Sequence, residues 1–244
     1  MASWNPWHGC HKKSEGCAHC YVYRIDERRG RNSSVVTKTS DFNLPVRRAR
    51  NGEYKIASGE LIWTCFSSDF LVEDADEWRP RAWEMMRERD DCEFLFITKR
   101  IERLVSVLPE GWGDCGFRNI TVCVTAENQC RADERLPIYL ESPLSRRMIC
   151  CEPLLGPVRL ERYLGPWISN VVVGGESGPD ARVCDFAWVQ SLREQCDRAG
   201  CGFYFKQTGA RFLKDGKVYL IPRRFQHAQA LRAGLNTVAL TGTV

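Results

Sequence analysis

The feature that most constrains the fold is a series of short apolar runs that begins after residue 60. Each run leads into a polar turn and then into a stretch whose apolar residues have helical spacing. The six runs predict strands at Leu61–Phe66, Glu93–Ile97, Ile120–Val124, Arg147–Cys151, Ile168–Val173 and Gly202–Phe205. Short apolar strands separated by helices are typical of buried parallel strands in βαβ units. We therefore predict an α/β fold, a partial or complete (β/α) TIM-like barrel of parallel strands, with a doubly wound sheet as the alternative.

The stretches between these runs are expected to be helices. Phe186–Ala199 is the clearest amphipathic helix, and 77–88 carries Trp78, Ala82, Met85 and Met86 at helical spacing. Shorter helices are predicted at 101–108, 131–140 and 159–164.

The domain organisation follows from the extent of this series. Residues 1–210 are expected to form one barrel domain that includes a short N-terminal cysteine loop, with 30–60 as a loop or small insertion. Residues 211–244 are expected to be a small C-terminal extension, in which Lys214-Asp215-Gly216-Lys217 predicts a hairpin. The small and polar residues at the end of the chain predict a frayed tail.

Composition excludes several classes of protein. The chain has 244 residues, 43% hydrophobic and 27% charged, which is unlike a disordered, collagen-like or coiled-coil protein. No run approaches eighteen apolar residues, and the N-terminus lacks the features of a signal peptide. We expect a cytoplasmic protein without a membrane segment. A net charge of +4 does not by itself indicate nucleic-acid binding.

Thirteen cysteines are an unusual number for such a chain. In a reducing compartment they indicate metal binding or buried thiols rather than a disulfide framework. Those in apolar or otherwise unremarkable surroundings are interpreted as core residues: Cys65, Cys123, Cys150, Cys151, Cys184, Cys196 and Cys201.

Cys10, Cys17 and Cys20 form a different group, with the spacing C-x6-C-x2-C. Gly9 and Gly16 precede two of these thiols and give the backbone freedom to turn. Two metal sites fit the pattern. A structural zinc would take a fourth ligand from the nearby histidines, His8, His11 or His19. An iron–sulfur cluster held by three thiolates would keep one iron open for a substrate or cofactor.

Three cysteines at the mouth of a predicted (β/α) barrel resemble the radical S-adenosylmethionine superfamily, although the usual spacing there is C-x3-C-x2-C. The chain more closely resembles an uncharacterised family of phage-type proteins with a three-cysteine motif. The stretches that carry this resemblance run from residue 4 to about 210. They are WNPWHGC (4–10), GCAHCY (16–21), FSSDF (66–70), TKR (98–100), CEPL (151–154), GGESG (174–178) and FKQ (205–207).

The superfamily resemblance implies a cofactor and a reaction. Cys10, Cys17 and Cys20 would hold a 4Fe–4S cluster, and S-adenosylmethionine would chelate its open iron. One electron from an external donor would cleave S-adenosylmethionine to a 5′-deoxyadenosyl radical, which abstracts hydrogen from a substrate. The sequence identifies neither the substrate nor the electron donor, nor whether a partner protein takes part.

Polar residues gather directly after the predicted strands, where barrel loops converge on one rim. The resemblance implies that Ser67, Ser68 and Asp69 contact the methionine end of the cofactor, and that Thr125, Glu127 and Asn128 hold its ribose. Gly174, Gly175 and Glu176 are further cofactor-binding candidates, and the candidate catalytic residues are Glu152, Glu176 and Lys206. For any single residue after a strand, the common alternative is capping of the next helix.

Aromatic and cationic residues alternate near the N-terminus and suggest a nucleotide or nucleic-acid substrate. They are Trp4, Trp7, Tyr21, Tyr23, Arg24, Arg28, Arg29 and Arg31. The alternative is a solvated helix face with tryptophans in the core. Two other functions remain open: a zinc-stabilised structural or nucleic-acid-binding protein that uses the same Cys/His cluster, and a hydrolase or lyase that uses the carboxylates at the strand ends.

Overall fold

The computed structural model describes residues 2–238. Its contacts group the chain into two compact units. The first consists of Met1–Lys12, Val22–Cys123 and Glu141–Arg146, and the second of Lys13–Tyr21, Val124–Leu140 and Arg147–Val244. The boundary between a barrel domain and an extension at residue 210 stays a prediction.

Parallel strands form the centre of the first unit. β1 (Ala2–Trp4) pairs with β4 (Leu61–Thr64), and β4 pairs with β5 (Glu93–Thr98). Phe94, Leu95 and Phe96 are all buried, so both faces of β5 are covered, as expected of a strand in a parallel sheet.

The second unit repeats this arrangement. β7 (Arg146–Cys151) pairs in parallel with β8 (Asn170–Gly174), which pairs in parallel with β10 (Gly202–Gln207). The chain passes from the first unit to the second within β6 (Ile120–Thr125). The seven strands have the order β1-β4-β5-β6-β7-β8-β10.

This order decides between the two sequence-based topologies. The strands follow one another in chain order, whereas a doubly wound sheet reverses its order at a switch point. The alternative of a doubly wound sheet is therefore wrong, and the prediction of an α/β fold with parallel strands is confirmed. All six predicted strands are present within a few residues of their expected ends.

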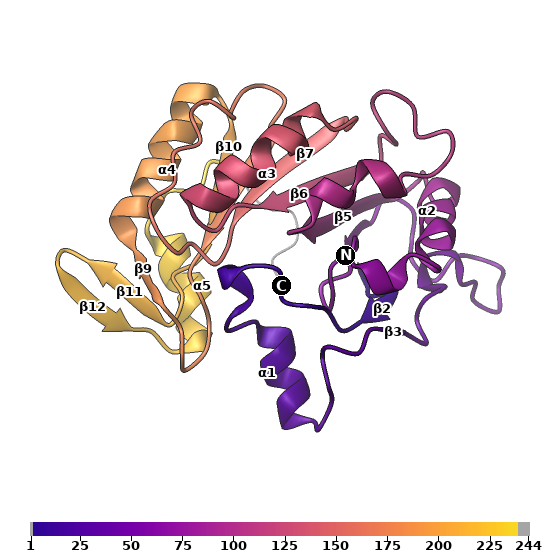
Figure 1. The fold of residues 1–244 in the computed structure, drawn as a ribbon, viewed down its shortest axis with the longest axis horizontal. Helices are drawn as coiled ribbons and strands as arrows, with labels where there is room; N and C mark the ends of the chain where they lie inside the picture. The colour runs from indigo at the N-terminus through magenta and orange to yellow at the C-terminus, as the bar shows by residue number, and fades with distance from the viewer. Residues whose placement is uncertain (1, 239–244) are drawn as a thin grey trace. The chain divides into compact units, whose positions relative to one another are not determined.

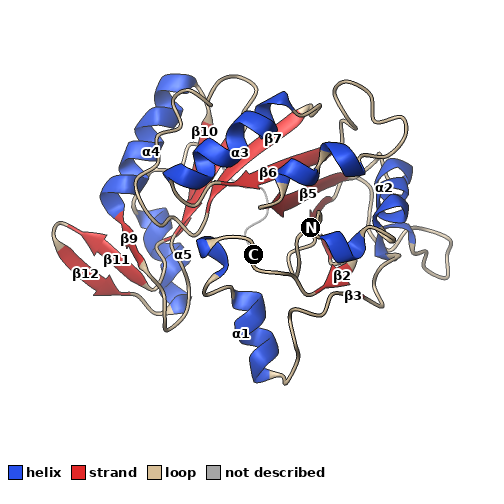
Figure 2. Cartoon of the chain, in the orientation of Figure 1, coloured by secondary structure: helices blue, strands red, loops and turns tan. Residues whose placement is uncertain are grey.

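Three predicted helices are present, as α2 (Arg79–Glu88), α3 (Gln129–Glu141) and α4 (Phe186–Ala199) (Figure 2). The ends of α4 are specified by its sequence. Asp185 accepts a hydrogen bond from the Ala187 amide at 2.9 Å, and Gly200 ends the helix in the left-handed conformation.

Two helix predictions are wrong. Residues 101–108 form two 3-10 turns, η4 (Ile101–Arg103) and η5 (Val105–Val107), because β-branched residues and the following Pro109 do not favour a continued α-helix. Residues 159–164 form a single turn that Gly165-Pro166 ends.

Several elements were not expected. They are the pair β2 (Trp7–His8) and β3 (Thr37–Lys38), β9 (Val183–Asp185), and α5 (Arg223–Arg232). The helix α1 (Tyr21–Arg28) agrees with the alternative interpretation of the N-terminal residues as a helix face. The predicted hairpin is confirmed as β11 (Arg211–Lys214) and β12 (Lys217–Leu220), with positive φ angles of 51° at Asp215 and 73° at Gly216. The expected frayed tail falls largely on residues outside the described part of the chain.

An aromatic cluster fills the core of the first unit. Phe70 stacks on Trp7 and Phe96 with ring centroids 5.1 and 4.6 Å apart, and it meets Trp83 edge-on. Trp4 and Trp7 are completely buried. They are core residues, as the alternative interpretation held, and their rings cannot stack on a nucleobase. Within residues 2–238, no helix combines the length and apolar character needed to cross a membrane.

Arg89 anchors the predicted loop segment 30–60 within the first unit. Its side chain is fully buried, and its guanidinium donates to the Pro45 carbonyl at 2.6 Å and to the Ile56 carbonyl at 2.9 Å. Asp91 neutralises the charge at 2.7 Å. One side chain thus satisfies backbone oxygens at two points of a segment with little regular structure.

We expect Arg89→Leu to lower the free energy of unfolding by about 3 kcal/mol, because it leaves two buried carbonyls and Asp91 without their donor. The matched control is Arg87→Leu, since Arg87 is exposed in the last turn of α2, just before Arg89. Thermal unfolding under reducing conditions checks this, and equal melting temperatures for the two variants would contradict it.

Candidate functional site

Exposure divides the thirteen cysteines into distinct groups. Eight are buried: Cys65, Cys92, Cys123, Cys150, Cys151, Cys184, Cys196 and Cys201. All seven cysteines predicted to be core residues are among them, so that prediction is confirmed. Burial raises the pKa of Cys184 and of Cys196 to about 12, and these thiols stay protonated at neutral pH. Cys10, Cys17 and Cys20 are partly exposed, and Cys115 and Cys130 are exposed.

In the first unit, the segment that carries Cys10 lies on the end of β4. The Gly9 amide donates to the Ser67 carbonyl at 3.2 Å, and the Ser68 hydroxyl donates to the Gly9 carbonyl. Gly9 has a φ of 95°, and a Cβ there would lie 2.5 Å from the Val35 carbonyl oxygen. The position therefore requires glycine, and Ser67 and Ser68 support the backbone beside Cys10.

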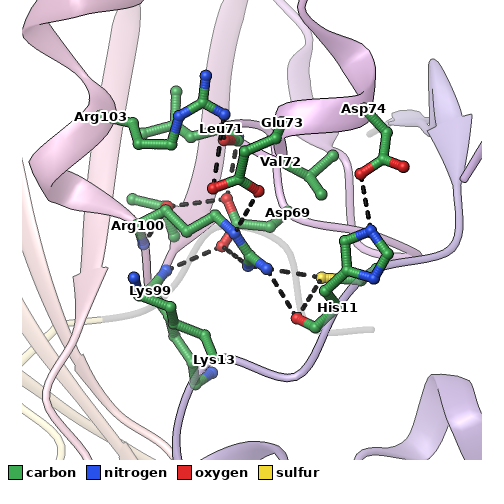
Figure 3. Close-up of polar contacts among 12 residues, drawn as sticks. His11, Lys13, Asp69, Leu71, Val72, Glu73, Asp74, Lys99, Arg100 and Arg103 are labelled. Carbon is green, nitrogen blue, oxygen red and sulfur yellow. Dashed lines mark hydrogen bonds and ion pairs between the residues drawn. The ribbon is translucent and has the colours of Figure 1, made fainter. Parts of the chain in front are cut away.

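Arg100, directly after β5, connects the ends of two strands to the same segment (Figure 3). Its Nη1 lies 3.6 Å from the Cys10 sulfur and 3.4 Å from the Asp69 carboxylate, and its Nη2 donates to the His11 carbonyl at 2.7 Å. Thr98 also donates to Asp69, at 2.8 Å. The Arg100 side chain is only 4% exposed, and these partners fix its position.

Electrostatics keep Arg100 charged. Burial alone would lower the pKa of its guanidinium, but the nearby Asp69 carboxylate and Cys10 sulfur raise it above the ordinary value. A cation that touches a sulfur atom stabilises negative charge on that sulfur. The Cys10 sulfur also lies 3.4 Å from the His11 carbonyl oxygen, to which its thiol can donate.

Acidic and basic side chains surround this contact in Figure 3. Glu73 pairs with Arg100 at 3.3 Å and with Arg103 at 3.6 Å, and His11 Nε2 lies 2.7 Å from Asp74. His8 Nε2 likewise lies 2.8 Å from the buried Asp26 carboxylate. Two of the three histidines proposed as a fourth zinc ligand therefore each place one ring nitrogen on a carboxylate.

In the second unit, Cys17 ends the 3-10 turn η1 (Glu15–Cys17). Its sulfur accepts a hydrogen bond from the Lys13 amide at 3.5 Å, and the Cys20 amide donates to the Cys17 carbonyl at 3.3 Å. A Cβ at Gly16 would lie 2.7 Å from a carboxylate oxygen of Glu127. The turn packs directly on that carboxylate, which also accepts a hydrogen bond from the Ser14 hydroxyl.

Glu127 and Thr125, predicted to hold a ribose, lie at the end of β6. Glu127 is fully buried and forms an ion pair with Arg135 at 2.8 Å, and Arg135 also donates to the Thr125 carbonyl at 2.8 Å. The Thr125 hydroxyl and the Nε and Nη2 atoms of Arg135 are buried without a partner among the described residues. Glu127 thus supports the turn that carries Cys17. Beside it, the Thr125 hydroxyl and two Arg135 nitrogens could still form hydrogen bonds.

Asn128, the third predicted ribose contact, is joined to the same turn. Its amide donates to Glu15, and Arg131 pairs with Glu15 at 3.0 Å. The hydrogen bonds from Arg131 are the main reason that the pKa of Glu15 falls to about 2. Glu15 is therefore ionised throughout the physiological range.

Two of the three candidate catalytic residues meet at the ends of β7 and β10. Lys206 Nζ lies 3.0 Å from one carboxylate oxygen of Glu152, and Gln207 donates to the other at 2.7 Å. The Glu152 carboxylate raises the pKa of Lys206, so the Lys206 amine stays protonated. Lys206 is 43% exposed and Glu152 is 15% exposed, which leaves the pair accessible.

Glu176 has a different environment. Its carboxylate accepts hydrogen bonds from Arg182 Nη2 at 2.7 Å, Arg182 Nε at 3.0 Å and the Arg182 amide at 2.9 Å. Burial alone would raise the pKa of Glu176, but these bonds lower it below the ordinary value. Glu176 therefore stabilises its own loop through Arg182.

Gly174 and Gly175 permit close packing at the end of β8. A Cβ at Gly174 would lie 2.9 Å from Glu152 Oε1, and one at Gly175 would meet the Thr208 carbonyl oxygen. Packing alone therefore requires glycine at both positions. Their predicted contact with a cofactor stays a prediction.

The sequence analysis did not identify Arg100, Arg135 or Arg182 as members of these networks. Arg100 could have been found, because it directly follows a strand within the TKR stretch. Arg135 gave no signal, since an arginine within a helix is normally exposed. A pocket of about 870 Å³ lies elsewhere in the first unit, lined in part by Arg87, Glu93, Arg118 and Arg146 at the starts of strands, where the sequence predicts no site.

The fit to a metal depends on three sulfurs that belong to different units. Cys10 lies in the first unit, and Cys17 and Cys20 lie in the second. Within the described part of the chain, no group of three or more His, Cys, Asp or Glu side chains is close enough together to hold a metal ion. Two of these sulfurs have polar partners within their own units, the Arg100 guanidinium at Cys10 and the Lys13 amide at Cys17.

We expect Gly16→Ala to displace the cysteine turn, since its methyl group would overlap the Glu127 carboxylate. Stability should fall by about 1–3 kcal/mol, and backbone amides 13–20 should exchange hydrogen faster. Gly156→Ala is the matched control, because nothing lies within 4 Å of a Cβ there. Hydrogen exchange followed by mass spectrometry measures both effects, and unchanged exchange in Gly16→Ala would refute the close contact.

Comparison with known proteins identifies the family of the chain. No curated protein and no solved structure matches the chain. A family model described as "Protein of unknown function (DUF5131)" matches residues 1–234, nearly the whole length. The chain therefore belongs to the DUF5131 family.

Proposed function

We propose that the chain is an iron–sulfur enzyme of the radical S-adenosylmethionine type, built on a partial (β/α) barrel. Cys10, Cys17 and Cys20 would hold a 4Fe–4S cluster. The observation that carries the proposal is the environment of these thiols. They are the partly exposed cysteines of one eleven-residue stretch, and two of them accept hydrogen bonds, from Arg100 and from the Lys13 amide.

The protein's own contribution is to prepare the sulfurs. Arg100 supplies positive charge to Cys10, and Asp69 orients Arg100. Hydrogen bonds to cluster sulfurs are among the factors that set a cluster's reduction potential. A bound cluster would supply the electron that cleaves S-adenosylmethionine and so begins hydrogen abstraction from a substrate.

Several residues are proposed to hold S-adenosylmethionine. The Thr125 hydroxyl is the best supported of these, because it is buried and has no partner among the described residues. Ser67, Ser68 and Asp69 would act at the methionine end in addition to their contacts with the chain. Asn128, Gly174 and Gly175 remain further candidates.

Glu152 and Lys206 are proposed to serve the substrate. They place a carboxylate and an ammonium 3.0 Å apart, and both groups are accessible. Such a pair can orient a polar substrate and hold a proton at Lys206 Nζ for transfer. Glu176 is less suited to this role, because Arg182 already occupies its carboxylate.

Anaerobic reconstitution with iron and sulfide should give a brown protein that absorbs at roughly 400 nm. Cys10→Ala, Cys17→Ala and Cys20→Ala should each lose most of the colour and iron. Cys115→Ala and Cys130→Ala are the controls, because these cysteines are exposed outside the stretch. If Cys17→Ala kept its colour, or if the purified protein were colourless with bound zinc, the proposal would fail and the zinc alternative would gain support.

Thr125→Val should weaken the binding of S-adenosylmethionine to the reconstituted protein about tenfold, the effect of losing one hydrogen bond. Iron content should not change, and thermal stability should not fall, because the hydroxyl has no partner to lose. Thr121→Val, on the same strand, is the control. Equilibrium dialysis measures the affinity, and equal affinities for the two variants would argue against a cofactor contact at Thr125.

A further inference from the structure

The C-terminal part of the second unit carries an unusual concentration of positive charge. Residues 208–232 contain six lysines and arginines but one acidic residue, Asp215. Their net charge of +5 exceeds the +4 of the whole chain, so the rest of the chain is slightly acidic. We name five of these cations the C-terminal basic surface: Arg211, Lys214, Lys217, Arg223 and Arg224.

The cations of the C-terminal basic surface have no carboxylate partner among the described residues, and all five are exposed. Two other exposed arginines of the second unit are paired, Arg162 with Asp133 at 2.6 Å and Arg198 with Glu161 at 3.9 Å. Unpaired cations that repel one another destabilise the folded chain slightly. Their grouping on one hairpin and at the start of one helix indicates that these cations bind an external anion.

Two aromatic rings are exposed among these cations. Tyr219 is 42% exposed and has Lys217 Nζ 5.2 Å from its ring centroid. Phe225 is 45% exposed and has the Arg224 guanidinium 4.7 Å from its centroid. Exposed rings combined with cations are the arrangement that binds the bases and backbone of a single strand.

The hairpin gives this surface an extended shape. β12 is the edge strand of the small sheet β12-β11-β9, and all four of its residues are exposed. Lys214 lies opposite Lys217 in the register, and Phe212 lies opposite Tyr219. Phe212 is anchored by Phe186 and Phe205, so the hairpin is fixed to the second unit while β12 faces outward (Figure 1).

We propose that the C-terminal basic surface binds single-stranded nucleic acid. A membrane surface fits less well, because the exposed apolar residues of α5, Phe225 and Leu231, are six positions apart and do not form one apolar face. An acidic protein would use the cations but would not need the exposed rings. This inference goes beyond the proposed function, since the surface contains neither the cysteines nor the strand ends.

The test is fluorescence anisotropy with labelled DNA and RNA single strands of about 15 nucleotides, using the full chain as purified. Five phosphate contacts predict that affinity falls roughly 100-fold between 50 and 200 mM salt. The double variant Lys214→Gln/Lys217→Gln should reduce that fall to about 20-fold. Tyr219→Ala should weaken binding about tenfold at either salt concentration.

The control is Arg50→Gln/Lys55→Gln, which removes two exposed cations of the segment 30–60 and should bind like the original chain. The proposal is overturned if this control loses affinity instead, if duplex DNA binds more tightly, or if only anionic lipid vesicles or no probe at all bind. The assay needs no cluster and no S-adenosylmethionine. Its failure is therefore distinct from failure of the proposed function.

Discussion

The first unit depends on a buried charge that joins three parts of the chain. Arg100 follows β5, Asp69 follows β4, and both reach the segment that carries Cys10 and His11. Neither charge could stay buried alone, because an isolated buried ion is costly. Each therefore requires the other, and the position of Cys10 follows from their pairing. The same contact thus stabilises the first unit and fixes the surroundings of the Cys10 sulfur.

The second unit contains a similar buried ion pair, formed by other residues. Glu127 is buried at the end of β6, neutralised by Arg135, and covered by the turn that carries Cys17. The absence of a side chain at Gly16 allows the turn to approach the carboxylate. In both units a carboxylate after a parallel strand, paired with an arginine, supports a cysteine segment. This common pattern accounts for several of the polar residues that follow strands.

The sequence was sufficient for the parts of the fold that local patterns specify. The strands were found because buried parallel strands are continuously apolar, and α4 was found because Asp185 and Gly200 mark its ends. The short strand β1 has three residues, too few to show a pattern. The pairings Glu127–Arg135 and Glu176–Arg182 could not be predicted, because the sequence does not say which cation reaches a carboxylate. The sequence did predict the hairpin turn at Asp215-Gly216, and it placed Glu152 and Lys206 at the ends of strands.

The eight buried thiols give the folded chain a protection that the unfolded chain lacks. While the protein is folded, oxygen and disulfides reach at most the five exposed or partly exposed sulfurs. Unfolding would expose the eight buried thiols together. The thiolates that form would then enter disulfides whose pairing does not depend on the native structure. Refolding in air would then be blocked by covalent cross-links. The chain's resistance to oxidation is therefore a kinetic property, set by how rarely the fold opens.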